Sequence, residues 1–283
     1  MSDSTPPMHP LVERAADTGR PVLHLFGGPM ISIHRRRVAV PEGSKRLLAF
    51  VALHRRRVER RYAAGVLWPA TDDARAAGNL RSALWRLNIP GVPLLSAEKC
   101  TLFMRDEVVV DVHEVGEWAA RLVGGSADAE DLKVLPSGVD GLNLLLGWYD
   151  DWVLIERERI RQRILHALEA LSRELIREGR CAEAVEAAMT AVSAEPLRES
   201  AQRSLIEAHV AEGNWVEGRR SYETYRELLR RELDAEPGPE LSTLLGVRVL
   251  ARNGPVRDCR LTSATCEEGT SLRQATTARP AVR

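Results

Sequence analysis

Four polar residues, Arg75, Asn79, Ser82 and Arg86, follow one another at steps of four, three and four residues. On a helix this spacing places them on one face, with Arg81 and Trp85 at its edges. Their functional groups suit the edges of DNA bases, because Arg binds guanine with two hydrogen bonds, Asn binds adenine, and Ser bonds base or backbone. The spacing therefore indicates a candidate DNA-reading helix, although an ordinary solvated helix also has a polar face.

The opposite face of the same segment is apolar and must point to a core. Ala77, Leu80, Leu84 and Leu87 recur at steps of three and four, which is the period of an amphipathic helix. The run Thr71-Asp72-Asp73 supplies an N-cap and acidic first-turn residues, so we expect the helix to run from there to about Asn88.

Charge is distributed unevenly along a chain that is neutral overall, with 40 Lys and Arg against 40 Asp and Glu. Residues 22–90 carry 13 basic against 4 acidic residues, a balance of +9, whereas residues 91–140 carry 4 against 10, a balance of −6. A basic block followed by an acidic one indicates that the first touches a polyanion and the second does not.

Two groups of arginines in the basic block have different expected roles. Arg35-Arg36-Arg37 is expected to form a solvated turn between strands. Arg55-Arg56-Arg57 and Arg60-Arg61 flank the start of a helix, where phosphate contact and simple solvation are equally compatible with the pattern. Arg60 is our candidate phosphate contact from this group.

The order of elements around the candidate helix is that of a winged helix. Short strands are expected at 22–26, 30–33 and 38–40, then helices at 45–54 and 60–67, and then the candidate helix. A hairpin made of 100–104 and 108–110 is expected to follow, and its basic residues Lys99 and Arg105 are the candidates for a wing contact with DNA.

From about Val112 to Leu250 the pattern is helical and contains an internal repeat. Gly179-Arg180 and Gly213-Asn214 lie 34 residues apart, which is the tetratricopeptide period, and Ala184 pairs with Gly218 at the same offset. Two repeats cannot bury a continuous face, so the helix 156–178 and those before it must complete the stack. The aromatic residues of this half are expected in its core rather than in a ligand cage: Trp148, Trp152, Tyr222 and Tyr225.

Residues 74–87, together with Val66-Leu67-Trp68-Pro69, resemble the recognition helix and preceding turn of the Streptomyces antibiotic regulatory protein family. Residues 146–159, 195–200 and 231–237 resemble the bacterial transcriptional activator domain. The resemblance implies an activator that binds direct repeats of double-stranded DNA as a homodimer, contacts RNA polymerase and controls secondary-metabolite genes. Asp72 and Asp73, in the loop between two helices, would then be placed to touch polymerase, although helix capping is their simpler use.

The expected architecture is mixed. A tail (1–20) precedes an α+β winged helix-turn-helix domain (21–111), an all-α tetratricopeptide-like activator domain (112–250) and a second tail (251–283). Both tails are expected to be disordered because they are polar and lack an apolar period.

Other classes of function find little support in the sequence. The chain has no P-loop, G-x-G-x-x-G, H-E-x-x-H or G-x-S-x-G motif, so no catalytic residue and no cofactor is expected. Its four cysteines lack metal-ligand spacing, and no apolar run reaches the length of a membrane span, which predicts a cytoplasmic, nucleoid-associated protein without a metal or membrane partner. The alternative reading is a tetratricopeptide-type protein-interaction scaffold that does not bind DNA.

Overall fold

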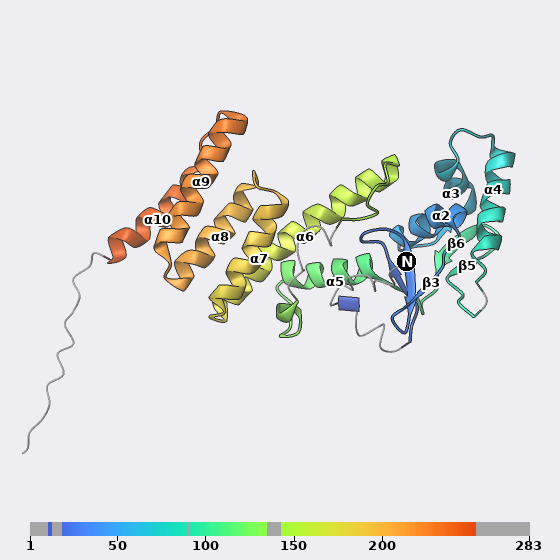
Figure 1. Ribbon diagram of the computed structural model, residues 1–283, viewed down its shortest axis with the longest axis horizontal. Coiled ribbons are helices and arrows are strands. Elements are labelled where there is room, and N and C mark those ends of the chain that lie inside the picture. The colour runs from blue at the N-terminus through green and yellow to red at the C-terminus, as the bar shows by residue number, and fades with distance from the viewer. Residues whose placement is uncertain (1–10, 13–18, 90, 135–142, 253–283) are drawn as a thin grey trace, which may run out of the picture.

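The computed structural model describes residues 11–12, 19–89, 91–134 and 143–252. An α/β part occupies one end of an elongated molecule, and a row of helices extends from it to the opposite end (Figure 1). This is the expected mixed class, an N-terminal part with sheets followed by an all-helical part.

Two small sheets frame the α/β part. The first has the order β3-β2-β1-β7, in which β1 (Val22–His24), β2 (Met30–Ile33) and β3 (Arg36–Val38) are antiparallel and β7 (Val109–Val110) runs parallel to β1. The second has the order β4-β6-β5, with β4 (Val58–Glu59) and β5 (Leu95–Ala97) both antiparallel to β6 (Thr101–Met104).

The turn expected at Arg35-Arg36-Arg37 lies one residue earlier. Ile33 pairs with Arg36, and the two residues between them, His34 and Arg35, have φ of 48° and 61°. Two consecutive residues with positive φ match the right-handed twist of a two-residue hairpin. Arg36 and Arg37 therefore belong to β3.

Three helices follow β3 in the chain: α2 (Glu42–Leu53), α3 (Arg60–Leu67) and α4 (Asp73–Arg86). The sequence predicted the bounds of α3 correctly, and those of α4 within two residues. The expected start of α2 at Lys45 is wrong, because the helix begins directly after Pro41, at Glu42.

The expected hairpin of 100–104 with 108–110 is also wrong. Strand β6 pairs with β5 instead, and this β5–β6 hairpin is the wing, with its turn between the two strands. Val108, Val109 and Val110 are all buried, which suits a strand that pairs with β1 at the edge of the first sheet rather than an exposed wing.

One buried carboxylate joins the first sheet to α5 (Asp111–Val123). Both oxygens of Asp111 accept the backbone N–H of Leu25, at 3.0 and 2.9 Å, and one also accepts that of Phe26 at 3.1 Å. The first residue of α5 is thereby fixed to the end of β1.

The helical part consists of α6 (Asp151–Arg177), α7 (Cys181–Ala194), α8 (Glu199–Glu212), α9 (Trp215–Leu233) and α10 (Pro239–Arg252), with the short 3₁₀ helix η1 (Asp131–Lys133) before it. The 34-residue repeat is confirmed in the backbone, because Gly179 and Gly213 end α6 and α8 with φ of 77° and 85°. Gly218 faces α8, where an added Cβ would lie 3.5 Å from Val210 Cγ2. Small residues at this position let the paired helices approach closely.

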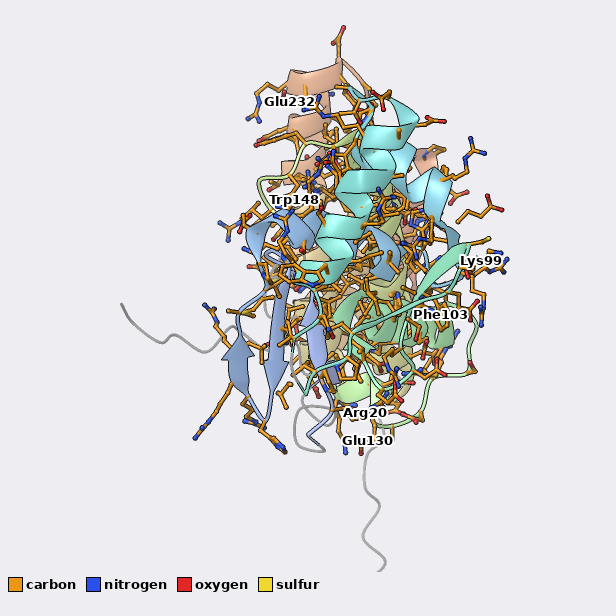
Figure 2. All side chains as sticks on the ribbon, turned by 90° about the vertical axis from the view of Figure 1, so that its right-hand side faces the viewer. Arg20, Lys99, Phe103, Glu130, Trp148 and Glu232 are labelled. Carbon is orange, nitrogen blue, oxygen red and sulfur yellow. The ribbon has the colours of Figure 1, made fainter. Side chains whose placement is uncertain are left out.

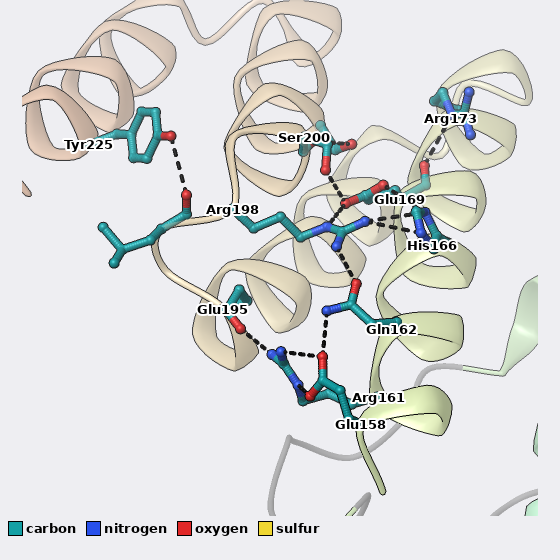
Figure 3. A network of polar contacts seen from close by, with 12 residues as sticks. Glu158, Arg161, Gln162, His166, Glu169, Arg173, Glu195, Arg198, Ser200 and Tyr225 are labelled. Atoms are coloured by element: carbon teal, nitrogen blue, oxygen red, sulfur yellow. Dashed lines mark hydrogen bonds and ion pairs between the residues drawn. The ribbon is translucent and has the colours of Figure 1, made fainter. Parts of the chain in front are cut away.

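A polar network holds the first repeat against the second (Figure 3). Arg198, just before α8, donates to Glu169 at 2.6 Å and to Gln162 at 2.7 Å, both on α6. Ser200 donates to the same Glu169 carboxylate at 2.7 Å. Because Glu169 is buried, these charge-assisted bonds fix the position of α8 on α6.

The two parts of the chain share one hydrophobic core. Buried residues from β1 through α8 form one connected cluster, and a second cluster joins α8, α9 and α10. Phe50 of α2 meets Trp152 of α6 edge-on at 5.2 Å, and Arg46 forms an ion pair with Asp150. Tyr225 is buried, and Trp148, Trp152 and Tyr222 are partly buried and pack against these clusters, so the prediction that the four aromatics pack in the core is confirmed.

The expected N-terminal tail is not tail throughout. Leu11 and Val12 are helical, and Val12 is fully buried against Val22 and Val109. The other residues of that segment up to position 18, and residues 253–283 of the second tail, lie outside the described residues, whereas Ala251 and Arg252 still belong to α10.

Acid is expected to weaken the fold through two histidines. Burial, aided by Arg37, lowers the pKa of His24 to about 4, and burial, aided by Arg55, lowers that of His113 to about 4. Both pKa values lie below the ordinary 6.5, so the unfolded chain takes up protons first, and the stability present above pH 6.5 is lost as the pH falls toward 4. Over this range the free energy of unfolding of the wild-type protein in urea should fall relative to that of the double variant His24→Gln, His113→Gln, which keeps all other titrating groups. Identical pH profiles for the two proteins would contradict this expectation.

Candidate nucleic-acid interface

Helix α4 presents its polar face to solvent, although its inward face is rotated from the expected one. The buried residues are Ala76, Leu80, Ala83 and Leu87, whereas Ala77 and Leu84 are only half-buried. Close approach of α2 explains the rotation, because Ser44 Oγ donates to the carbonyl of Ala83 at 2.9 Å and only a small side chain fits there.

The rotation changes what the predicted base-reading residues can do. Arg75, Arg81 and Ser82 are exposed, as expected, but Asn79 is half-buried. Arg86 is exposed and its guanidinium turns back, with Nε donating to Ser82 O at 3.2 Å and Nη1 beside Gly43 of α2. The centre of the exposed face is therefore the line through Gly78 and Trp85, and the sequence had placed Trp85 at its edge.

A groove with a basic rim lies between α3, α4 and the wing. It has a volume of about 680 Å³ and a floor of small and apolar side chains. Four cationic side chains, Arg60, Arg61, Arg81 and Lys99, line it together with one acidic side chain, Asp73. Arg61 was noted in the sequence only as part of a basic run, and its place in this groove depends on the packing of α3 against α4.

The wing is anchored to the start of α3 by Arg60. Its backbone N–H donates to Cys100 O at 2.9 Å and its Nη1 to Glu98 O at 3.1 Å. Lys99 lies in the turn of the wing and extends from the outer edge of the α/β part (Figure 2). Arg60 and Lys99 thus share one rim, as a joint phosphate contact would require.

Arg105 does not lie at the tip of the wing. It follows β6 at the end opposite Lys99, where it forms an ion pair with Glu107 at 3.2 Å. The error follows from the wrong hairpin, in which residues 105–107 were the turn.

Arg57 lies directly before β4 and contacts the wing, whereas the sequence presented it only as part of an arginine run in which phosphate contact and solvation were equally compatible. Its guanidinium lies 4.3 Å from the centroid of the Phe103 ring and forms an ion pair with Glu98. The hydrogen bonds from Arg57 and Thr101 hold the pKa of Glu98 below its ordinary value. In the same arginine run, Arg55 points elsewhere, because it donates to His113 O on α5 at 2.6 Å.

The two acidic residues before α4 have different environments. Asp72 caps the helix, accepting the backbone N–H of Arg75 at 2.8 Å. Asp73 lies 3.4 Å from Arg61, and both side chains are more than nine-tenths exposed. An ion pair this exposed contributes little to stability, so Asp73 is available to a partner.

The part of the chain that the structure describes offers neither a metal site nor a membrane-spanning helix. Its His, Cys, Asp and Glu side chains form no group that could hold a metal ion. None of its helices combines the length and the apolar character that crossing a membrane requires.

Residues 138–246 match the family described as the bacterial transcriptional activator domain, which covers fewer than half of the 283 residues. This is a family of transcriptional activator domains and not of enzymes. The match includes α6 to α9 and the start of α10, so the helical part of the chain is similar to such a domain.

Most of the chain is similar in structure to Mycobacterium tuberculosis EmbR, solved in complex with a low affinity phosphopeptide. The TM-score is 0.54 at 19% sequence identity, and the match covers 84% of this chain and 66% of the other, slightly under two thirds. At this identity the likeness concerns the fold alone. No curated protein matches the chain.

Two helical glycines are expected to cost the α/β part stability. A Cβ added at Gly78 of α4 would meet only Arg81 Nη2 at 3.7 Å, and one added at Gly65 of α3 would have nothing within 4 Å. Gly78→Ala and Gly65→Ala should therefore each raise the free energy of unfolding by about 1 kcal/mol, the difference in helix propensity. Gly213→Ala, at φ 85°, should lower it. Urea unfolding measures all three, and destabilisation by Gly78→Ala would contradict the open space around it.

Proposed function

We propose that the protein is a sequence-specific DNA-binding transcriptional activator that binds direct repeats upstream of promoters and recruits RNA polymerase. The observation that carries the proposal is the basic groove between α3, α4 and the wing, in a chain whose helical part matches a transcriptional activator domain. The genes it controls are proposed, on the family resemblance of α4, to be those of secondary metabolism.

The exposed polar residues of the groove and of α4 have two different roles in this proposal. Arg60, Arg61 and Lys99 on the rim neutralise phosphates and set the position of the protein on the duplex. Arg75, Arg81 and Ser82 on α4 contact base edges in the major groove. Asn79, half-buried, and Arg86, held against α2, flank the contact rather than lie at its centre.

A single winged helix reads few base pairs, so we propose a homodimer on two repeats spaced by about one helical turn. The helical parts of two copies would hold the pair in register. The loop from Trp68 to Asp73 projects at the start of α4, and its exposed carboxylates are proposed to meet a basic surface of RNA polymerase.

The pure scaffold is the weaker candidate. It offers no reason for four cations to surround one groove. Moreover, Glu169 and Arg198 on the helical part are already satisfied by residues of this chain.

DNA binding and its salt dependence test the proposal. Full-length protein should select duplexes from a random library, and the affinity should fall steeply with salt because bound phosphates release counterions. Arg81→Ala should weaken binding to the selected duplex by about 1–3 kcal/mol and relax preference at one position, while Lys99→Ala should reduce the salt slope by about 1. The matched control is Arg220→Ala, an exposed arginine on α9 at the opposite end of the molecule (Figure 1). Equal affinity of all these variants for the selected duplex would refute the assignment of the groove.

Polymerase contact can be tested without disturbing the helix cap. Asn caps a helix as well as Asp does, so the double variant Asp72→Asn, Asp73→Asn removes both charges and preserves the start of α4. Because Asp73 lines the basic groove beside Arg61, we expect this variant to bind DNA at least as tightly as wild type, and to show reduced activation in transcription in vitro with purified polymerase on promoters saturated with protein. Full activation by this variant would remove the loop from the mechanism.

A further inference from the structure

Trp85 is exposed where a tryptophan has no structural use. Its side chain is 80% exposed, whereas each of the other five tryptophans of the chain is buried or half-buried. Leu87 and Leu80 take the inward positions of α4 on either side of it. An indole exposed to this extent leaves a large apolar face and one N–H donor available to a partner.

The position of Trp85 on α4 tells what faces it. Trp85 follows Gly78 by seven residues and Ala74 by eleven, so all three lie along one line of the helix. Arg81 and Ser82 flank this line one turn before Trp85, and Arg81 also lines the basic groove. Ala74 and Gly78, which come first on this line, have at most a methyl group as side chain. The backbone of α4 can therefore approach a surface closely up to Trp85.

We propose that Trp85 reads a thymine by packing its indole against the C5-methyl group in the major groove. This inference rests on the proposed DNA-binding function. The thymine methyl is the apolar group that base edges present in that groove, and Trp85 is the large apolar side chain of the line, whose other members are Ala74 and Gly78. The indole has a large apolar face, no acceptor and a single N–H donor, so it suits a methyl better than it suits the phosphates that the cations neutralise.

The difference between thymine and uracil isolates this contact. In the duplex selected by the full-length protein, each thymine is replaced in turn by deoxyuridine, which removes the methyl and leaves the hydrogen-bonding groups unchanged. Wild-type protein should lose about fourfold in affinity at one position, the contribution of one buried methyl group. Trp85→Ala should bind the thymine and uracil duplexes of that position equally.

Two further variants separate this role from a general effect of exposed aromatics. Trp85→Leu keeps an apolar side chain and should retain part of the preference for thymine. Tyr149→Ala removes an aromatic side chain that is 79% exposed in the helical part, and it should leave both affinity and thymine preference unchanged. Since Trp85 lies outside the core, its variants should unfold at the same urea concentration as wild type.

These experiments separate a failure of the thymine contact from a failure of the proposed DNA-binding function. If the full-length protein selects no duplex, the proposed function fails. If it selects one and Trp85→Ala keeps the thymine preference, or loses affinity equally for thymine and uracil at every position, the methyl contact is overturned and the function stands. If Trp85→Ala binds like wild type but no longer activates transcription, Trp85 contacts protein and the inference is again overturned.

Discussion

The carboxylate of Asp111 accepts three backbone N–H groups, those of Leu25, Phe26 and Val112, in a site closed to water. Removal from water outweighs these bonds and raises its pKa to about 7. The residue directly follows the parallel strand β7 and begins α5, so its carboxylate connects the first sheet to the helix that packs on α6. The position of the basic groove relative to the helical part of the chain therefore depends on the Asp111 carboxylate, although Asp111 does not line the groove.

Periodicity was sufficient to predict the elements that bury a continuous face. The bounds of α3, the N-cap at Asp72 and the turns at Gly179 and Gly213 all follow from local rules of capping and repeat length. The order of strands, three helices and a hairpin also indicated the winged helix, because that order requires no knowledge of long-range contacts.

The errors arose where a distant partner decides the structure. Val108–Val110 has the composition of any strand, and only its pairing with β1 separates it from the wing. Leu95–Ala97 follows two prolines and carries a weak strand signal, yet its register with β6 makes it the wing. Likewise, a periodic pattern cannot tell Ala76 from Ala77 as the inward residue, because the choice depends on how closely α2 approaches at Ala83. The candidate site moved with that choice, from Asn79 and Arg86 toward Gly78 and Trp85.

The connected core from β1 to α8 has a mechanical consequence. Phe50 against Trp152, and Arg46 with Asp150, tie α2 directly to α6, so the α/β part is braced against the long helix rather than joined to it by a linker alone. Helix α10 lies at the far end of the molecule from α4 (Figure 1). When an elongated rigid body rotates about one end, the other end moves the farthest. A small rotation of the protein about α4 would therefore displace α10 by a much larger distance. For two copies bound along one duplex, the twist of the DNA between them would thus be converted into the separation of their far ends.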